Sequence, residues 1–263
     1  MNLTTDNLQR LLTFPFRGPE WQSRLGIAML VLVAGWIVPI LPWLVLTGYA
    51  VQIARRVAIE GREPELPPWT DWSAYLVDGF KVSLVRFVVA LPILVVLIGG
   101  QFLAFGSAIT GGIIGASGGS DMRDLGSLIA VLGSLTGFGL FFVLLPVLLI
   151  VGLIVPVPSM HVVVTGEVGA MFRFAEWWRI LRADIGAWAM GYLVLIALGL
   201  LVNLVTSILT ATIVLCAVLP IFLVVYMTYS MLITEVIFAQ AYRSSTQKLA
   251  LPPGTADVNV SAP

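Results

Sequence analysis

The sequence predicts an all-α integral membrane protein with about six transmembrane helices arranged as three hairpins. Its 263 residues include 14 Lys and Arg and 14 Asp and Glu, together 11% of the chain, whereas a soluble domain has roughly 25% charged residues. Hydrophobic residues make up 59%. This composition excludes an ordinary cytosolic enzyme, a nucleic-acid-binding protein and a disordered chain.

Four long stretches without Asp, Glu, Lys or Arg determine where the helices are expected. They cover residues 25–54, 87–120, 125–166 and 185–234. A spanning helix needs about 20 residues, so the last stretch holds two helices and each middle stretch holds one with loops. The first stretch is ambiguous, since it fits one long helix, a full hairpin or a re-entrant segment.

A hairpin is favoured for the first stretch because Pro39 and Pro42 lie in its middle, flanked by Trp36 and Trp43. Hairpins at about 21–58, 83–161 and 185–240 also leave every Lys and Arg except Arg123 on one side of the membrane. The positive-inside rule makes that side the cytoplasm. The sequence therefore predicts a multi-pass protein of the cell membrane with both termini cytoplasmic.

A pattern of an acidic residue, Trp, and Leu four residues after the Trp occurs three times. The tryptophans are Trp21, Trp72 and Trp177. Each precedes a hairpin, so we expect each to be an interfacial anchor on an amphipathic helix lying at the cytoplasmic surface. The returning arms share a Leu-Pro start, at 41–42, 145–146 and 219–220. These features predict a parallel pseudo-repeat of two-helix units; the alternative is that Trp and Pro recur because interfaces and helix starts favour them.

The second and third units also agree in register at a spacing of 105 residues, which pairs Gly61 with Gly166 as well as Trp72 with Trp177. The middle hairpin carries a glycine-rich insert at 106–119, which predicts either close helix packing or an external loop. Residues 1–243 are expected to form a single membrane domain. Residues 244–263 are expected to be a disordered cytoplasmic tail.

Few ionisable residues fall inside the predicted bilayer. Glu235 and Arg86 lie at similar short depths from the cytoplasmic face, and we expect them to form an intramembrane polar pair; the alternatives are a proton or cation site and a snorkelling pair. The single histidine, His161, has no carboxylate near it in the sequence, so a hydrogen-bonding role is favoured over a catalytic one. Asp78 and Lys81, three residues apart, are expected to pair on an exposed helix surface.

Several segments together resemble a known family. They are Phe14-Pro15-Phe16 with Pro19-Glu20-Trp21, Gly48-Tyr49, Arg55-Arg56, Glu65-Leu66-Pro67-Pro68-Trp69-Thr70-Asp71-Trp72, Asp78-Gly79 and Phe172-Arg173-Phe174-Ala175-Glu176. The chain is similar, over about 12–243, to the bacterial and archaeal multi-pass membrane family called domain of unknown function 4013. The resemblance implies an integral membrane protein without an established activity, so it carries over no catalytic residue.

The sequence favours a non-enzymatic membrane scaffold or interaction protein, with the lipid bilayer, a protein partner or a second copy of the chain as its contacts. No cofactor, metal site or nucleic acid is expected, because one Cys and one His leave no ligand cluster and the net charge is zero. The alternative is a transporter or lipid-handling protein with a site between hairpins, suggested by parallel repeats and Pro-broken helices.

Overall fold

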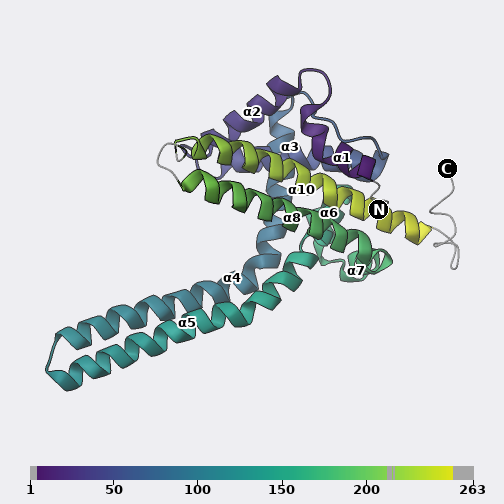
Figure 1. Cartoon of the computed structure of the whole chain (residues 1–263). Helices are drawn as coiled ribbons and strands as arrows, with labels where there is room; N and C mark the ends of the chain where they lie inside the picture. The colour runs from purple at the N-terminus through teal and green to yellow at the C-terminus, as the bar shows by residue number, and fades with distance from the viewer. Residues whose placement is uncertain (1–4, 212–214, 216, 251–263) are drawn as a thin grey trace. The chain divides into compact units, whose positions relative to one another are not determined.

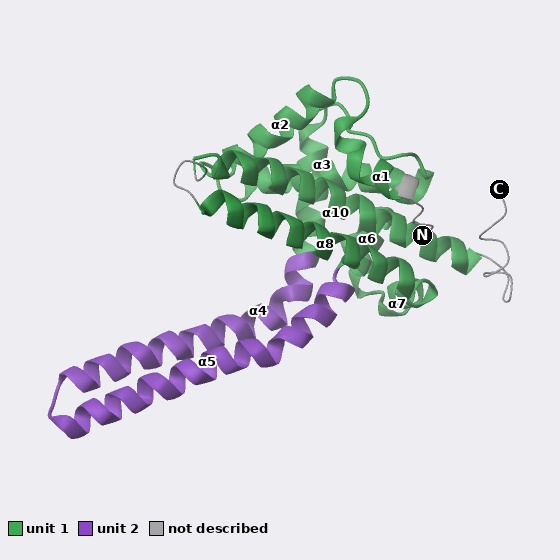
Figure 2. Cartoon of the chain, in the orientation of Figure 1, with its two compact units in different colours: residues 1–85, 156–263 green, residues 86–155 purple. Residues whose placement is uncertain are grey.

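The computed structural model describes residues 5–211, 215 and 217–250. Across these residues the chain is all-helical and contains no strand, as the sequence predicts. The helices belong to two compact units (Figures 1 and 2). Unit 1 comprises 1–85 and 156–263, and unit 2 comprises 86–155.

Unit 1 begins with helix α1 (Thr5–Thr13), a 3-10 turn (Phe14–Phe16), α2 (Trp21–Ala34) and α3 (Leu41–Arg55), which ends in a π-helical turn (Arg56–Glu60). The first apolar stretch is therefore two helices that contact each other, not one long helix. Helix α3 starts at the Leu-Pro pair, because proline fits the first turn of a helix. The two helices have 14 and 15 residues, or about 21 and 22 Å each.

The chain returns to its starting end after this pair of helices. Arg10, before α2, forms an ion pair of 3.1 Å with Glu63, after α3. The indole Nε1 of Trp69 donates a hydrogen bond of 2.9 Å to the carbonyl oxygen of Arg24. The segments that flank the first apolar stretch therefore lie together, as a hairpin requires.

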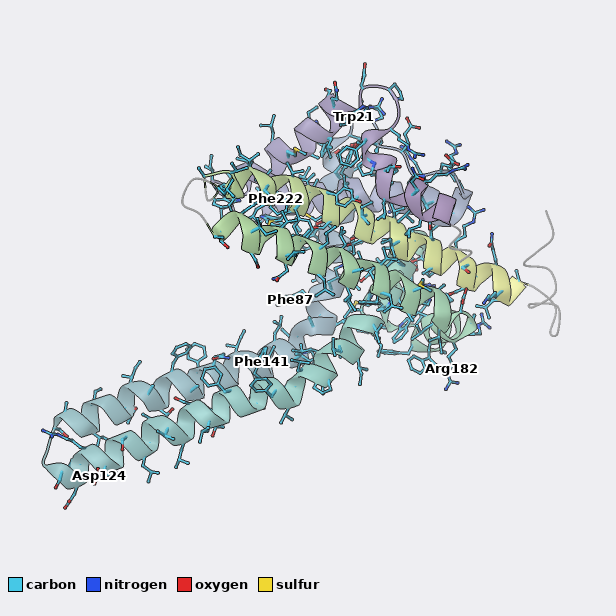
Figure 3. All side chains as sticks on the ribbon, viewed as in Figure 1. Trp21, Phe87, Asp124, Phe141, Arg182 and Phe222 are labelled. Carbon is cyan, nitrogen blue, oxygen red and sulfur yellow. The ribbon has the colours of Figure 1, made fainter. Side chains whose placement is uncertain are left out.

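Helices α4 (Trp72–Ala116) and α5 (Ser120–Ile154) supply unit 2, with Asp124 near the turn between them (Figure 3). The glycine-rich insert is helical through Ala116, and its residues 117–119 form the connection to α5. Both alternatives therefore hold in part, with close packing at Gly111 and a loop at the end of the insert. A Cβ added to Gly111 would lie 2.3 Å from the carbonyl oxygen of Gly126, and the reverse distance is also 2.3 Å. Only glycine lets the two backbones approach this closely.

The rest of unit 1 contains α6 (Pro156–Thr165), a 3-10 turn (Val168–Phe172), α7 (Phe174–Ala183), α8 (Ile185–Thr210) and α10 (Leu219–Ala250). Helix α10 forms the core, since it contacts α1, α2, α3, α6, α7 and α8 (Figure 1). Its residues 232, 233, 235–239, 241 and 242 are all buried. This run is apolar except for Glu235 and explains why the other helices gather around α10.

Two expectations need correction. Pro146 lies inside α5, so the second Leu-Pro pair does not begin a returning arm; proline is tolerated in apolar helices that pack against neighbours. Helix α10 continues to Ala250, so residues 244–250 are not part of a disordered tail. Ser245 is fully buried and accepts a hydrogen bond of 3.0 Å from Trp188 Nε1. The rest of the predicted tail, 251–263, and the single cysteine, Cys216, lie outside the described residues.

The predicted repeat is only partly visible. Trp21 and Trp72 are the first residues of the apolar helices α2 and α4, and only Trp177 lies on a separate amphipathic helix, α7. The first two acid-Trp segments thus continue directly into an apolar helix. Gly61 and Gly166, which share register, both adopt the left-handed conformation (φ 67° and 75°) after a helix end. That agreement supports the relation between the second and third units.

Four helical segments are long and apolar enough to cross a membrane by length and composition. They are Trp72–Ala116, Ser120–Thr165 (α5 with α6), Ile185–Thr210 and Leu219–Ala250. Helix α2 is apolar but shorter. The chain is therefore a helical protein of membrane-protein composition, and the count of six spans stays a prediction.

Candidate functional site

A set of polar contacts in unit 1 surrounds helix α6. Helix α6 begins at Pro156, and Pro158 also lies in its first turn, where proline is tolerated. Residues 156–163 are all buried. The last carbonyls of a buried helix need donors from elsewhere. Arg55 Nε donates 2.9 Å to the carbonyl oxygen of Val163, and Lys81 Nζ donates 3.1 Å to that of Gly166. Two cations at the C-terminal end also complement the helix dipole.

Arg55 is fixed in turn by Asp78, whose Oδ2 lies 2.8 Å from Arg55 Nη1. The carboxylate side chain is only 13% exposed and the arginine 32%. The predicted pair of Asp78 with Lys81 is therefore wrong. Asp78 pairs with Arg55 and not with Lys81 because the Arg55 guanidinium binds both the Asp78 carboxylate and the Val163 carbonyl of α6. A pair of Asp78 and Lys81 on an exposed helix surface would not do this.

His161 lies within a chain of side chains that runs from the core toward the surface. Its Nδ1 is 2.8 Å from Tyr242 Oη, and its Nε2 is 3.1 Å from Glu176 Oε2. The histidine side chain is 6% exposed and the glutamate 50%. A carboxylate therefore does lie beside His161, which the sequence did not indicate because Glu176 is 15 residues away. This arrangement orients the ring and joins α6, α7 and α10.

The Glu-Leu-Pro-Pro-Trp run of the family resemblance is packed within unit 1. Tyr49 Oη donates 2.8 Å to the carbonyl oxygen of Pro67, and Tyr75 Oη donates 2.8 Å to that of Pro68. The Trp69 ring stacks on Tyr49 at a centroid distance of 4.0 Å. Prolines lack N–H donors but their carbonyls accept, so two tyrosines hold the segment in place.

Asp184 joins the start of α8 to the end of α10. Its carboxylate accepts from the Ala187 backbone N–H, as an N-cap does, and from Ser244, and it lies 3.0 Å from Lys248 Nζ. Burial alone would raise the pKa of this carboxyl, but the hydrogen bonds from Ser244 and Lys248 outweigh it and hold the pKa below its ordinary value.

The three tryptophans predicted as interfacial anchors differ in exposure. Trp72 is 46% exposed. Trp21 is half-buried, and its ring centroid lies 5.6 Å from that of Phe16. Trp177 is only 7% exposed, and its Nε1 donates 3.0 Å to the Met171 carbonyl oxygen. Its role as an interfacial anchor stays a prediction. Successive side chains of a helix point about 100° apart, so the side chain of the neighbouring Trp178 points away from the Trp177 contacts and is exposed.

The intramembrane candidates are placed as follows. Glu235 lies in α10 and is 3% exposed; Arg86 lies in α4, is half-buried and is the first residue of unit 2. Their pairing stays a prediction. On α8, Ser207 Oγ and Thr210 Oγ1 donate to carbonyl oxygens of their own helix, at 2.9 and 3.0 Å, so these hydroxyls satisfy their hydrogen bonds within the helix.

Comparisons with known proteins give one match. The model of a family described as "Protein of unknown function (DUF4013)" matches residues 31–215. No curated protein and no solved structure matches the chain. The match includes the Arg55–Asp78 pair, the proline-rich segment and α6 with His161. Because it covers well over half of the sequence and agrees with the predicted resemblance, the chain belongs to the DUF4013 family.

Proposed function

We propose that this chain is a non-enzymatic membrane scaffold, whose apolar helices are covered by lipid and by other protein subunits. The observation that carries the proposal is how little of each long helix is buried within the chain. The most apolar window is 0% buried in α8, 11% in α4, 11% in the α5–α6 segment and 39% in α10. Such surfaces need an apolar environment, and a membrane with protein neighbours provides one.

The polar groups of unit 1 support a structural role over an enzymatic one. Asp78 with Arg55 completes the end of α6, and Asp184 completes the start of α8. His161 is hydrogen-bonded through both ring nitrogens. These groups are thus engaged in joining helices, whereas an active site would require a nucleophile, base or metal set converging on open space.

A transporter or lipid-handling protein is the second candidate. It is favoured by the burial of Glu235 and His161, 3% and 5% exposed, since buried ionisable groups in membrane proteins often mark transport paths. It is also favoured by the short α2 and α3, because half-length helices that meet inside a membrane are common in transporters.

Native mass spectrometry separates these two functions. The protein would be purified in mild detergent from the membrane in which it occurs and its assemblies weighed directly. A scaffold is expected at a discrete mass above that of one chain, with additional protein subunits in fixed ratio. A monomer that retains one defined solute or lipid would contradict the scaffold and support the transporter.

For orientation, we propose that both termini face the cytoplasm of a cell membrane. Support comes from contacts among the charged segments: Arg10 with Glu63, Lys81 with the Gly166 carbonyl, and Arg243 with the Val57 carbonyl at 3.5 Å. Segments that meet in this way share one side of the bilayer, and they carry most of the Lys and Arg. The positive-inside rule assigns that side to the cytoplasm.

Single-cysteine labelling tests the orientation. On a background with Cys216 replaced by Ser, cysteines at 18 and 62 should react with a membrane-impermeant maleimide only after the cytoplasmic side is opened. A cysteine at 123, near the turn between α4 and α5, should react from outside in intact cells. Labelling of 18 and 62 from opposite sides is the result that excludes the proposed topology.

A further inference from the structure

Helix α7 has an apolar buried face and an apolar exposed face. Trp177 and Ile180 are each 7% exposed and pack into unit 1, while Phe174 and Trp178 are 61% and 42% exposed. Phe174 and Trp178 are four residues apart and so lie on one side of the helix. A ten-residue helix that presents two large aromatic rings outward needs an apolar contact beyond this chain.

A shallow hollow, open over most of its extent, lies on this helix. It is lined by Phe174, Ala175, Trp177 and Trp178. Every lining side chain is apolar or aromatic, so the hollow accepts a hydrocarbon group better than water or a free ion.

Positive charge borders the same face. Arg182 Cζ lies 5.4 Å from the ring centroid of Trp178, and Arg182 is exposed on α7 (Figure 3). Arg179, next to Trp178, is also exposed. Among the residues that the structure describes, neither arginine forms an ion pair with a carboxylate, whereas Arg173 pairs with Glu167 at 2.6 Å. Arg179 and Arg182 are thus available to an anion from outside the chain.

The position of α7 along the chain places this face at the edge of a membrane helix. Only Asp184 separates α7 from α8, which is long and apolar enough to span. The first residue of α8, Ile185, is 58% exposed. Aromatic rings and arginines directly before a spanning helix belong at the depth of the lipid head groups.

We propose that α7 binds an anionic membrane phospholipid. The phosphate contacts Arg179 and Arg182, whose guanidinium groups suit phosphate oxygens. The glycerol and upper acyl chain contact Phe174, Trp178 and the hollow beside them. An apolar hollow beside two arginines favours a lipid over a soluble phosphate, because a soluble phosphate has no hydrocarbon to place in the hollow. This inference depends on the membrane location of the chain but not on whether it is a scaffold or a transporter.

Lipid selectivity gives the first test. The protein in neutral detergent is titrated with phosphatidylglycerol or phosphatidylcholine of identical acyl chains, and bound lipid is counted by native mass spectrometry. Phosphatidylglycerol should bind more tightly, and Arg179→Gln and Arg182→Gln should each reduce this preference about fivefold, as expected for one basic residue at an anionic surface. Arg62→Gln is the matched control, because Arg62 is 73% exposed and lies away from α7 in the sequence; it should leave the preference unchanged.

A depth measurement gives the second test and does not depend on the arginine variants. A nitroxide at position 178 in lipid nanodiscs, on the Cys216→Ser background, should be relaxed more by oxygen than by a water-soluble nickel complex. A nitroxide at Glu167, whose side chain is 64% exposed, should show the reverse. A water-exposed label at 178 overturns the proposal, as does equal affinity for both lipids. Full competition by glycerol 3-phosphate would likewise overturn it, by identifying a free head group as the ligand.

The subunit count from native mass spectrometry distinguishes this failure from failure of the scaffold. Loss of lipid preference with an unchanged assembly contradicts only the lipid site. A monomer that keeps its phosphatidylglycerol preference contradicts only the scaffold.

Discussion

Replacing Gly48 or Gly79 with Ala should destabilise the protein by about 3 kcal/mol or more, beyond the usual range for overpacking. These two glycines lie where α3 crosses the first part of α4. A Cβ added to Gly48 would lie 1.7 Å from the carbonyl oxygen of Tyr75, and one added to Gly79 would lie 1.8 Å from that of Leu44. In both cases the obstacle is backbone, so the helices must separate to admit a single methyl group.

The measurement is thermal unfolding in mild detergent, where a loss of this size corresponds to about 10 °C. Gly26→Ala is the matched control, because Gly26 lies in α2 and a Cβ there meets nothing within 4 Å. That change should be neutral or slightly stabilising, since Ala favours helix over Gly. The double variant Gly48→Ala/Gly79→Ala should cost less than the sum of the single variants, because either methyl already separates the helices. Equal stability of all three single variants would show that α3 and α4 do not cross at these glycines.

Apolar length and proline position predicted much of the fold. Charge-free runs identified the long helices, and the prolines at 39 and 42 correctly indicated a break in the first stretch. The Leu-Pro pairs at 41 and 219 mark helix starts, because each proline is the second residue of its helix, where its missing N–H leaves no intrahelical bond unmade. Pro146 has the same local sequence but lies inside a continuous helix. The surroundings of the helix decide between these outcomes, and one sequence does not contain them.

The polar contacts were much less predictable than the helices. Pairing Asp78 with Lys81 followed from helix spacing, but Arg55, 23 residues away, forms the bond instead. The His161 contacts to Glu176 and Tyr242 span 15 and 81 residues. Such pairs depend on how helices pack, which local periodicity does not encode. The proline-rich family motif was the best available signal, since its carbonyls accept from Tyr49 and Tyr75.

The face of a short helix was the hardest feature to assign. Trp177 fits the repeat register and was expected at the membrane surface, yet its indole N–H bonds a carbonyl inside unit 1. Trp178 lies one residue after the position that matches the repeat, and its side chain is exposed. Helix α7 is amphipathic, and its one broad apolar side holds both Trp177 and Trp178, so composition does not identify which edge of that side packs inward. Only the contacts with the remainder of unit 1 settle this.

Replacing Arg55 or Asp78 with Leu should cost about 2 kcal/mol in each case, less than the roughly 3–5 kcal/mol for breaking a fully buried pair, because Arg55 remains 32% exposed. Either single change leaves the other residue charged but without this ion-pair partner among α3, α4 and α6. The double leucine variant should recover part of this loss, since it removes both charges together.

Thermal unfolding of the four proteins, from the unchanged chain to the double variant, measures the coupling between Arg55 and Asp78. The control is the Arg10–Glu63 pair, whose side chains are 60% and 79% exposed at a similar distance of 3.1 Å. Exposed pairs contribute at most about 1 kcal/mol, because water screens both charges. The coupling free energy should therefore be clearly larger between Arg55 and Asp78 than between Arg10 and Glu63. Recovery in the double variant should stay incomplete, because the Val163 carbonyl loses its Arg55 donor in either case. Simple additivity at 55 and 78 would mean that the pair does not hold α6 in place.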